Sequence, residues 1–213
     1  MTEFTIHVID DDLSVRCAVG RLLRSYDQPV RTYPSAREFL SQKLDSRPAC
    51  VVLDLQMPGM SGLDLQEVLT RGHESLSIVF ISGHADILDS VRAMKAGAVD
   101  FLTKPFDECQ LLAAVDTALE RSRQACIHRD ALCRDRAIFE TLTRREREVC
   151  VRVAQGMLNK QIGGEFGTAE KTIKVQRGRV MQKLGAQSVT DIVRLVERLR
   201  DCGHLPPSSL PGN

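Results

Sequence analysis

The sequence predicts two domains: an α/β domain built on a five-stranded, parallel, doubly wound sheet, and a smaller domain made only of helices. Three observations support this division. Five short apolar runs alternate with amphipathic stretches in the first half of the chain, as strands and helices do in a parallel sheet covered on both faces. From residue 141 onward the pattern is helical throughout. The length of 213 residues is too great for one small domain and suits two.

The apolar runs and the stretches between them predict the elements of the first domain in order. The predicted strands are Thr5–Asp10, Val30–Tyr33, Cys50–Asp54, Ile78–Ser82 and Val99–Leu102. The predicted helices are Ser14–Ser25, Ala36–Ser41, Gly62–Arg71, Ile87–Ala96 and Asp107–Arg121. Ser35, three residues before Glu38, fits a capping box, as does Ser14 if it begins its helix. Gly97 suits a helix end, and Asp12 is best explained as a cap or turn residue.

Domain boundaries are predicted where these patterns change. The boundaries place the α/β domain at 1–121, a helical linker at 122–140, the helical domain at 141–202 and a disordered tail at 203–213. The linker is charged and lacks Pro and Gly, so it can continue the preceding helix. A surface helix packed on either domain is the alternative. Glycine-containing breaks divide the helical domain into four helices, at Gly156–Met157, Gly167–Thr168 and Gly185–Ala186.

The composition excludes several classes of protein. No run of about 18 apolar residues exists, so we expect no helix in a membrane. The N-terminus is acidic where an export signal would be basic, which favours a cytoplasmic protein. Seven cysteines form no CxxC pair and no cluster at zinc spacing, which indicates reduced thiols. Cys126 and Cys133, seven residues apart, leave a redox switch open, but ordinary buried or surface thiols explain them better.

The formal net charge of +1 hides an uneven distribution of charge. Residues 1–120 hold 11 Lys/Arg and 18 Asp/Glu, a net charge of −7. Residues 141–200 hold 13 Lys/Arg and 6 Asp/Glu, a net charge of +7. This asymmetry suggests a metal-binding or regulatory domain joined to a domain that binds a polyanion.

Polar side chains follow four of the five predicted strands. Asp10, Asp54 and Ser82 end three strands, and Lys104 comes shortly after the fifth. Ligands of open parallel sheets bind outside the carboxyl ends of the strands, so we expect these side chains at one edge. Asp11 adds another carboxylate, and clustered carboxylates repel unless a hard cation lies among their oxygens. The sequence therefore predicts a divalent metal beside one reactive carboxylate.

These residues resemble the receiver domain of bacterial two-component response regulators, which has a flavodoxin-like fold. The motifs DLQMPGMSGLDL at 54–65 and VRAMKAGAVDFLTKPF at 91–106 are typical of it. The resemblance implies that Asp54 accepts a phosphoryl group from the phosphohistidine of a sensor histidine kinase. It also implies that Mg²⁺ is the cofactor. The implied metal-binding residues are Asp11, Asp54, the backbone carbonyl of Gln56 and, through a water, Asp10.

The same resemblance gives roles to three further residues. Lys104 pairs with Asp54 at rest and with the phosphoryl group afterwards, and Ser82 hydrogen-bonds a phosphoryl oxygen. Phe101 rotates inward as a switch, which changes the surface of the fourth helix and fifth strand. Without the resemblance, Phe101 is an ordinary core residue of a strand. The peptide bond between Lys104 and Pro105 is expected to be cis, as in relatives.

The second domain contains a short helix at Asn159–Phe166 and a longer one at Glu170–Leu184, the plan of a helix-turn-helix. The longer helix has an apolar face and a basic face, so it can enter a major groove. Residues 143–196 resemble the LuxR-type DNA-binding domain of FixJ/NarL regulators. The residues that carry this resemblance are LTRREREV (142–149), NKQIGGEFG (159–167), KTIKVQRGRVMQKLG (171–185) and SVTDIVRLV (188–196).

Contacts to double-stranded DNA are predicted on the outer face of the longer helix. Lys174 and Val175 are predicted base contacts, because lysine can bind guanine acceptors and valine can touch a thymine methyl. The predicted phosphate contacts are Lys160, Lys171, Arg179 and Lys183. Arg177 lies nearer the buried face, and we expect it to form an ion pair with Glu146 or Glu148.

Some positions depart from the family pattern. Ala169 stands where a serine commonly caps the longer helix, and Thr168 is expected to cap it instead. Gln176 replaces a common histidine. Gly163 and Gly164 each weaken the short helix by up to about 1 kcal/mol relative to alanine. These changes bear on affinity and base preference, not on DNA binding itself.

The sequence thus predicts a cytoplasmic transcription factor and not an enzyme. Phosphorylation of Asp54 is expected to favour a homodimer on DNA or to free the DNA-binding domain. The resemblance alone supports dimerisation, and it allows RNA polymerase as a further partner. One alternative is a haloacid-dehalogenase-type phosphatase, although Gln56 stands where such enzymes usually have a second carboxylate. The other is a regulator that responds through its thiols.

Overall fold

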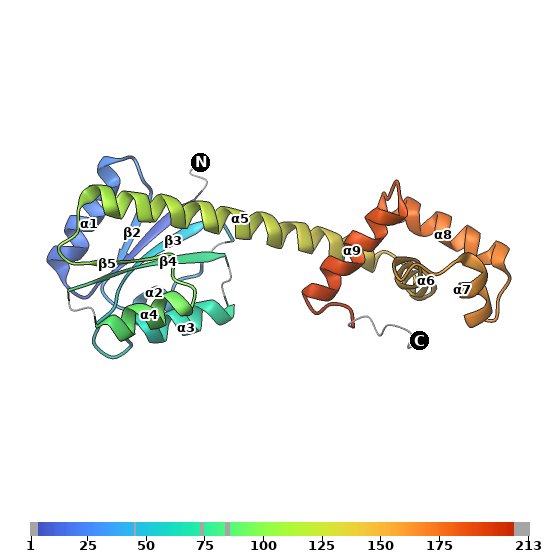
Figure 1. Cartoon of the computed structure of the whole chain (residues 1–213). Helices are drawn as coiled ribbons and strands as arrows, with labels where there is room; N and C mark the ends of the chain where they lie inside the picture. Colours follow the sequence, from blue (N-terminus) through green and yellow to red (C-terminus); the bar gives the residue numbers. More distant parts are fainter. Residues whose placement is uncertain (1–3, 45, 73–74, 84–85, 207–213) are drawn as a thin grey trace. The chain divides into compact units, whose positions relative to one another are not determined.

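The computed structural model describes residues 4–44, 46–72, 75–83 and 86–206 (Figure 1). The chain divides into two compact units, Met1–Arg129 and Asp130–Asn213. The division falls within residues 122–140, which the sequence predicts as a helical linker. This stretch is helical and belongs to α5 (Glu108–Glu140), which runs from the first unit into the second without a break.

The first unit contains a sheet of five parallel strands in the order β2-β1-β3-β4-β5. The strands are β1 (Thr5–Ile9), β2 (Val30–Tyr33), β3 (Ala49–Asp54), β4 (Leu76–Ser82) and β5 (Asp100–Thr103). Each boundary lies within two residues of the predicted one. The strand order is that of the doubly wound flavodoxin-like fold, which confirms the predicted fold class.

Helices cover both faces of this sheet, as Figure 1 shows. α1 (Leu13–Ser25) and the first part of α5 cover one face. α2 (Ala36–Leu40), α3 (Gly62–Gly72) and α4 (Ile87–Lys95) cover the other. With two covered faces, successive side chains of each strand enter opposite cores, so the strands read as continuous apolar runs.

Strand residues divide between the two cores by alternation. The core under α1 and α5 contains Ile6, Val8, Cys50, Val52, Val79 and Ile81. The core under α2, α3 and α4 contains Ile9, Val51, Leu53, Ile78 and Phe80. Because both sets are buried, the register of the strands is fixed, and so are the positions of the polar residues at their carboxyl ends.

The structure confirms three predicted cap residues, Ser35, Gly97 and Asp12, and one predicted helix start differs. Ser35 caps α2 by accepting the Glu38 N–H at 3.2 Å, and Gly97 follows α4 with a φ of 97°. The prediction that Ser14 begins α1 is wrong. Asp12 is the cap, because its carboxylate accepts the N–H of Ser14 at 2.7 Å, and the helix starts one residue earlier. The third aspartate of the acidic run is therefore structural.

Three buried or half-buried side chains on one face of α5 bind backbone groups of the first unit. Ser122 accepts the N–H of Ala49 at 2.8 Å. Cys126 lies 3.5 Å from the carbonyl oxygen of Ser46, and Arg129 donates to the same oxygen at 2.7 Å. Their spacing of four and three residues places them on one helical stripe. The helix is thus fixed to the first unit up to Arg129.

In its described residues, up to 206, the second unit is all-helical, with a core formed by four helices and the end of α5. Its helices are α6 (Arg144–Ala154), α7 (Asn159–Glu165), α8 (Glu170–Leu184) and α9 (Val189–Asp201). The core contains Phe139, Leu142, Val149, Cys150, Val153, Ile162, Ile173, Val180, Ile192, Leu195, Val196 and Leu199. α7 and α8 lie at the predicted positions of the helix-turn-helix.

The predicted disordered tail is wrong for its first residues. Gly203 adopts a φ of 73°, and the N–H groups of His204 and Leu205 both donate to the carbonyl of Leu199. The side chain of Leu205 packs against the core. A glycine-terminated helix end thus extends the fold to this point. Residues 207–213 of the predicted tail lie outside the described residues.

All seven cysteines are free. Cys17, Cys109, Cys133 and Cys202 are exposed, and Cys50, Cys126 and Cys150 are buried. Burial raises the pKa of the Cys50 thiol and raises that of Cys150 to about 12, so both stay protonated at neutral pH. In the parts of the chain that the structure describes, no helix has the length and apolar character needed to cross a membrane.

Candidate functional site

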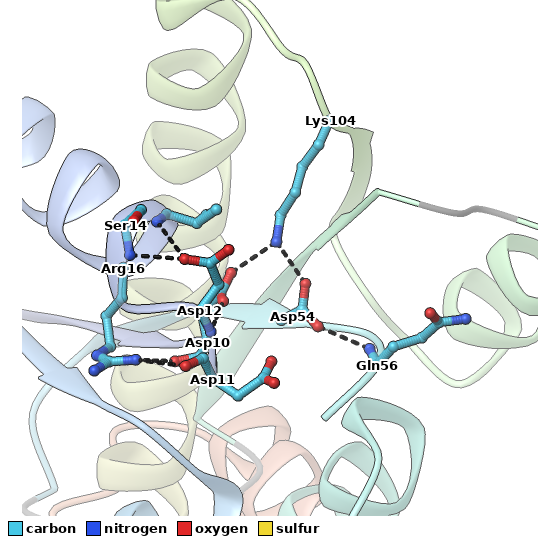
Figure 2. A network of polar contacts seen from close by, with 9 residues as sticks. Asp10, Asp11, Asp12, Ser14, Arg16, Asp54, Gln56 and Lys104 are labelled. Atoms are coloured by element: carbon cyan, nitrogen blue, oxygen red, sulfur yellow. Dashed lines mark hydrogen bonds and ion pairs between the residues drawn. The ribbon is translucent and has the colours of Figure 1, made fainter. Parts of the chain in front are cut away.

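Four of the predicted site residues lie at the carboxyl edge of the sheet. Asp10 follows β1, Asp54 ends β3, Ser82 ends β4 and Lys104 follows β5. Figure 2 shows Asp10, Asp54 and Lys104 pointing toward one another. The parallel register explains this, since neighbouring strands end side by side: Ile9 lies opposite Leu53, and Ser82 opposite Thr103.

Lys104 binds both central carboxylates at once. Its Nζ lies 2.7 Å from Asp10 Oδ2 and 2.6 Å from Asp54 Oδ1. The Asp10 and Asp54 side chains are only 1% and 8% exposed, and that of Lys104 is 20% exposed. Two buried carboxylates would repel each other strongly, so the ammonium group between them is what allows them to lie together.

The remaining carboxylate oxygens accept backbone hydrogen bonds. Asp10 Oδ1 accepts the N–H of Asp12 at 2.8 Å, and Asp54 Oδ2 accepts the N–H of Gln56 at 2.9 Å. Arg16 donates to the carbonyl oxygens of Asp10 at 2.5 Å and of Asp11 at 3.2 Å. These bonds fix the direction of both carboxylates. Sequence reasoning missed Arg16, because its contacts are to backbone and leave no motif.

The electrostatics of the site follow from burial and the shared lysine. Burial raises the pKa of Asp54; the hydrogen bond and charge of Lys104 lower it, and the nearby Asp10 raises it, with a net increase. Burial alone would lower the pKa of Lys104, but its hydrogen bonds to Asp10 and Asp54 give a net increase. Lys104 therefore remains an ammonium ion at neutral pH and favours an ionised Asp54.

Ser82 and Phe101 lie beside this group. Ser82 is buried, and its carbonyl oxygen accepts the N–H of Lys104 at 2.7 Å. The Lys104–Pro105 peptide bond is cis, as predicted. Phe101, on β5, is half-buried, and its ring stacks on that of Phe80 at a centroid distance of 6.0 Å. Phe101 thus lies at the edge of the core and is not enclosed by it.

The donor atoms at this edge suit a divalent cation. Asp10, Asp11 and Asp54 supply carboxylate oxygens, the ligands that Mg²⁺ prefers. Asp11 is exposed, and Figure 2 draws no hydrogen bond to its carboxylate. Within the described ranges, no three Asp, Glu, His or Cys side chains are gathered closely enough to hold a metal ion.

Gly62 allows α3 to approach the strand end that carries Asp54. A Cβ atom at this position would overlap the carbonyl oxygen of Asp54 and lie 2.9 Å from the ring of Phe80. The Gly62 N–H donates to the carbonyl oxygen of Leu55 at 2.9 Å. The turn after Asp54 therefore requires glycine, a role that sequence reasoning did not assign.

The outer face of α8 is the candidate nucleic-acid interface of the second unit. Lys171, Lys174 and Arg179 are exposed, and Val175 is 50% exposed although it is apolar. Lys160 is exposed on the neighbouring helix α7. The opposite face of α8 buries Ile173 and Val180. The helix thus has the two faces that the sequence predicts.

Two polar contacts of α8 differ from the prediction. Arg177 forms no ion pair with Glu146 or Glu148; its Nη1 donates to Asn159 Oδ1 at 3.2 Å, because α7 begins next to it. Glu146 instead binds Lys183 at 2.7 Å. The predicted phosphate contact of Lys183 stays a prediction, but its ammonium group already has a partner.

The beginning of α8 also differs from the prediction. Ala169 occupies the cap position and makes no side-chain cap bond, so the expectation that Thr168 caps the helix is wrong. The Thr168 backbone is held by Gly163, whose carbonyl oxygen accepts its N–H at 2.9 Å. A Cβ atom at Gly163 would lie 2.8 Å from the Thr168 carbonyl oxygen, whereas one at Gly164 would meet nothing within 4 Å. Only the first of the two glycines is required by the turn.

Comparison with known families accounts for both units. Residues 6–116 match the response regulator receiver domain, and residues 140–196 match the luxR family of bacterial regulatory proteins. The chain belongs to the two-component response regulators. It therefore regulates transcription in a two-component system, as the sequence predicts. The receiver domain implies a histidine kinase as a partner, and the LuxR-type domain implies DNA.

Individual relatives of this response regulator match nearly its whole length. Nodulation protein W of Bradyrhizobium diazoefficiens is 44% identical over 93% of this chain and 87% of the relative. Response regulator protein TmoT of Ectopseudomonas mendocina is 43% identical over 93% of this chain and 90% of the relative. The solved structure of the response regulator StyR is 44% identical, with a TM-score of 0.79, and covers 92% of this chain and 100% of that chain.

Proposed function

We propose that Asp54 of this response regulator accepts a phosphoryl group from the phosphohistidine of a sensor histidine kinase, in a Mg²⁺-dependent reaction. The observation that supports this most directly is the shared binding of Asp10 and Asp54 by Lys104. This arrangement places the Lys104 ammonium group 2.6 Å from the Asp54 carboxylate, at the end of β3. Such a group can bind the oxygens of an incoming phosphoryl group.

In the transfer, a carboxylate oxygen of Asp54 attacks phosphorus. A P–O bond forms and the P–N bond breaks; the imidazole nitrogen takes the electron pair and a proton from solvent. The ionised carboxylate has no proton to lose, so no general base is needed. The barrier is mainly electrostatic and positional. Lys104 binds the phosphoryl oxygens, and the Ser82 hydroxyl donates to one of them.

Mg²⁺ would be held by Asp11, Asp54 and the backbone carbonyl of Gln56, with Asp10 acting through a water. When bound, it offsets the negative charge that accumulates between the carboxylates and the phosphoryl oxygens. The hydrogen bond from the Gln56 N–H keeps the second Asp54 oxygen fixed while the first one reacts. Lys104, which Asp10 holds in place, binds the other Asp54 oxygen, so the two contacts together orient the nucleophile.

Phosphorylation then changes the surface of the receiver. Ser82 moves toward the phosphoryl group, and the half-buried ring of Phe101 turns into the space that it leaves. The changed surface of α4 and β5 favours a homodimer or frees the DNA-binding domain. A two-fold dimer reads two half-sites of an operator.

In the second unit, we assign base contacts to Lys174 and Val175, which are exposed one after the other on α8. Lys160, Lys171 and Arg179 contact phosphates. Lys174→Ala is expected to reduce discrimination between duplexes, whereas Lys171→Ala weakens binding to all duplexes alike. Competition binding with a panel of mutated duplexes tests this. Unchanged site preference in Lys174→Ala would contradict the assignment.

The test of the phosphoacceptor uses acetyl phosphate and Mg²⁺. We expect one phosphoryl group per chain in the wild type and in Asp64→Asn, and none in Asp54→Asn, by intact-mass spectrometry. Asp64 is a suitable control because it is an exposed carboxylate of the same unit, in the first turn of α3. Continuous release of phosphate from many phosphoesters would instead indicate a phosphatase. Absence of label, with an oligomeric state that follows the reductant, would indicate a thiol-dependent regulator.

A further inference from the structure

The last turn of α8 is tied to the start of α6 through one buried carboxylate oxygen. Glu146 lies in the first turn of α6, and its side chain is 6% exposed. Its Oε2 accepts the backbone N–H of Thr143 at 2.8 Å and a hydrogen bond from Lys183 Nζ at 2.7 Å. In return, the Thr143 hydroxyl accepts the Glu146 N–H at 3.3 Å. A single oxygen therefore closes the cap of α6 and holds the end of α8.

This arrangement restricts what Lys183 can do. Removing the cationic partner of a buried carboxylate strongly destabilises a protein. If Lys183 moved to a DNA phosphate, Glu146 would lose the closest positive charge that the structure gives it. The hydrogen bonds from Lys183 and Thr143 lower the pKa of Glu146 to about 2, so the carboxylate remains charged at neutral pH and needs that partner.

Polar contacts add to the apolar packing of α8, whose partly buried side chains Met181 and Leu184 also lie against the core. Its fully buried side chains are Ile173 and Val180. At the middle of α8, Arg177 contacts Asn159 of α7 at 3.2 Å. Lys183 contacts α6 beyond Val180, in the last turn of α8, which ends at Leu184. The pair therefore limits tilting of the end that lies farthest from the turn between α7 and α8.

We propose that Lys183 is a positioning residue for the recognition helix: Glu146 holds it, and the pair sets the angle at which α8 presents Lys174 and Val175 to DNA. The inference rests on the proposed DNA binding by α8. It replaces the expectation that Lys183 contacts a DNA phosphate. Under this proposal, Glu146 matters for DNA binding although it is buried and negatively charged.

The two roles predict opposite signs for one substitution. Glu146→Gln removes a negative charge and keeps an oxygen that can accept the Thr143 N–H. If Lys183 contacted phosphate, this change would release the lysine and raise DNA affinity. If Lys183 positions α8, the change breaks the ion pair and lowers affinity by about tenfold, a typical coupling for contacting residues.

The experiment measures binding of the full chain to a duplex that the wild type enriches from a random pool, over a range of salt concentrations. Lys183→Met and Glu146→Gln are each expected to lower affinity about tenfold, and the double variant no further. Lys183→Arg keeps the charge and is expected to restore wild-type binding. The salt slope should stay unchanged in Lys183→Met, whereas the control Lys171→Met should lower it by about one.

A second readout needs no DNA. In the free protein, α8 amides more than one turn from the substituted residue are expected to shift alike in Lys183→Met and Glu146→Gln and to stay in place in Lys171→Met. A gain of affinity in Glu146→Gln, or a reduced salt slope in Lys183→Met, overturns the positioning role. So do unmoved α8 amides in both variants. Failure of the wild type to bind any duplex overturns the proposed function instead, and the amide shifts still decide the positioning of α8.

Discussion

At the scale of single residues, Lys104 and Lys183 each compensate carboxylate charge that burial would otherwise make unfavourable. Lys104 lies between Asp10 and Asp54, and Glu146 lies between a helix cap and Lys183. The sequence predicted only one of these two sets of contacts. The strand ends predicted the first set, because parallel strands end at one edge. No local pattern joined Glu146 to Lys183, which is 37 residues away.

Replacing Lys104 with Met should make Asp54 a weaker acid. The lysine lowers the pKa of Asp54 against the effects of burial and Asp10, so its removal raises that pKa further. The receiver then loses stability as pH rises through the pKa of Asp54, by on the order of 2 kcal/mol at neutral pH. Carboxyl ¹³C titration without Mg²⁺ and urea unfolding at pH 5 and 7.5 measure both effects. Lys95→Met, which replaces an exposed lysine of α4, serves as the control. An unchanged Asp54 titration in Lys104→Met would contradict the prediction.

Glu146 should titrate far below an ordinary glutamate. Its pKa is lowered from 4.5 to about 2, chiefly by the hydrogen bond from Lys183. A lowered pKa means that the carboxylate stabilises the second unit above about pH 4.5 and that this contribution is lost as pH falls toward 2. Side-chain ¹³C shifts of Glu146 report the midpoint. A midpoint near 4.5 in the wild type would show that the ion pair does not form in solution.

At the scale of elements, the two glycines of α7 separate by function. Gly163→Ala is expected to destabilise the second unit and weaken DNA binding, because the added Cβ would lie 2.8 Å from the Thr168 carbonyl oxygen. Gly164→Ala meets no atom and should stabilise the unit by up to about 1 kcal/mol through helix propensity. Thermal unfolding and DNA binding of both variants check this. Equal effects of the two substitutions would refute the steric argument.

The attachment of α5 to the first unit should depend on Ser122. Its hydroxyl accepts the buried N–H of Ala49 and donates to the carbonyl oxygen of Ser75. Ser122→Ala leaves these groups unpaired and should cost about 1–3 kcal/mol. Both tyrosines of the chain, Tyr26 and Tyr33, lie in the first unit, so tyrosine fluorescence during urea unfolding reports on it. The exposed residue Thr117 supplies the control variant Thr117→Ala, which should change little.

The elements themselves were predictable because burial on both faces leaves continuous apolar runs in the strands. The observed helix boundaries differ from the predicted ones where a single contact determines the helix end. Asp12 and not Ser14 determines the start of α1, because its carboxylate accepts two backbone N–H groups of the first turn. The sequence predicts a disordered tail from Gly203 because this stretch is rich in proline and serine, whereas Leu205 packs against the core. The contact of Leu205 depends on tertiary packing and has no short-range signature.

At the scale of the whole molecule, the two halves carry charges of −7 and +7 over the residue ranges given above. The basic half should make DNA affinity strongly dependent on salt. With three proposed phosphate contacts per chain, a dimer is expected to give a slope of log affinity against log salt concentration of about −5. A monomer should give about −3. Binding isotherms with and without beryllofluoride, a phosphoryl mimic, measure both slopes. Identical slopes and masses in the two states would contradict phosphorylation-dependent dimerisation.

The division of the cysteines has a practical consequence for spectroscopy. The shielded thiols of Cys50 and Cys150 are poor nucleophiles, whereas Cys17 and Cys109 of the first unit and Cys133 and Cys202 of the second are open to solvent. Maleimide probes should therefore attach to native surface positions without disturbing either core. Retaining one surface thiol per unit would yield a doubly labelled regulator whose energy transfer can be followed while acetyl phosphate is added.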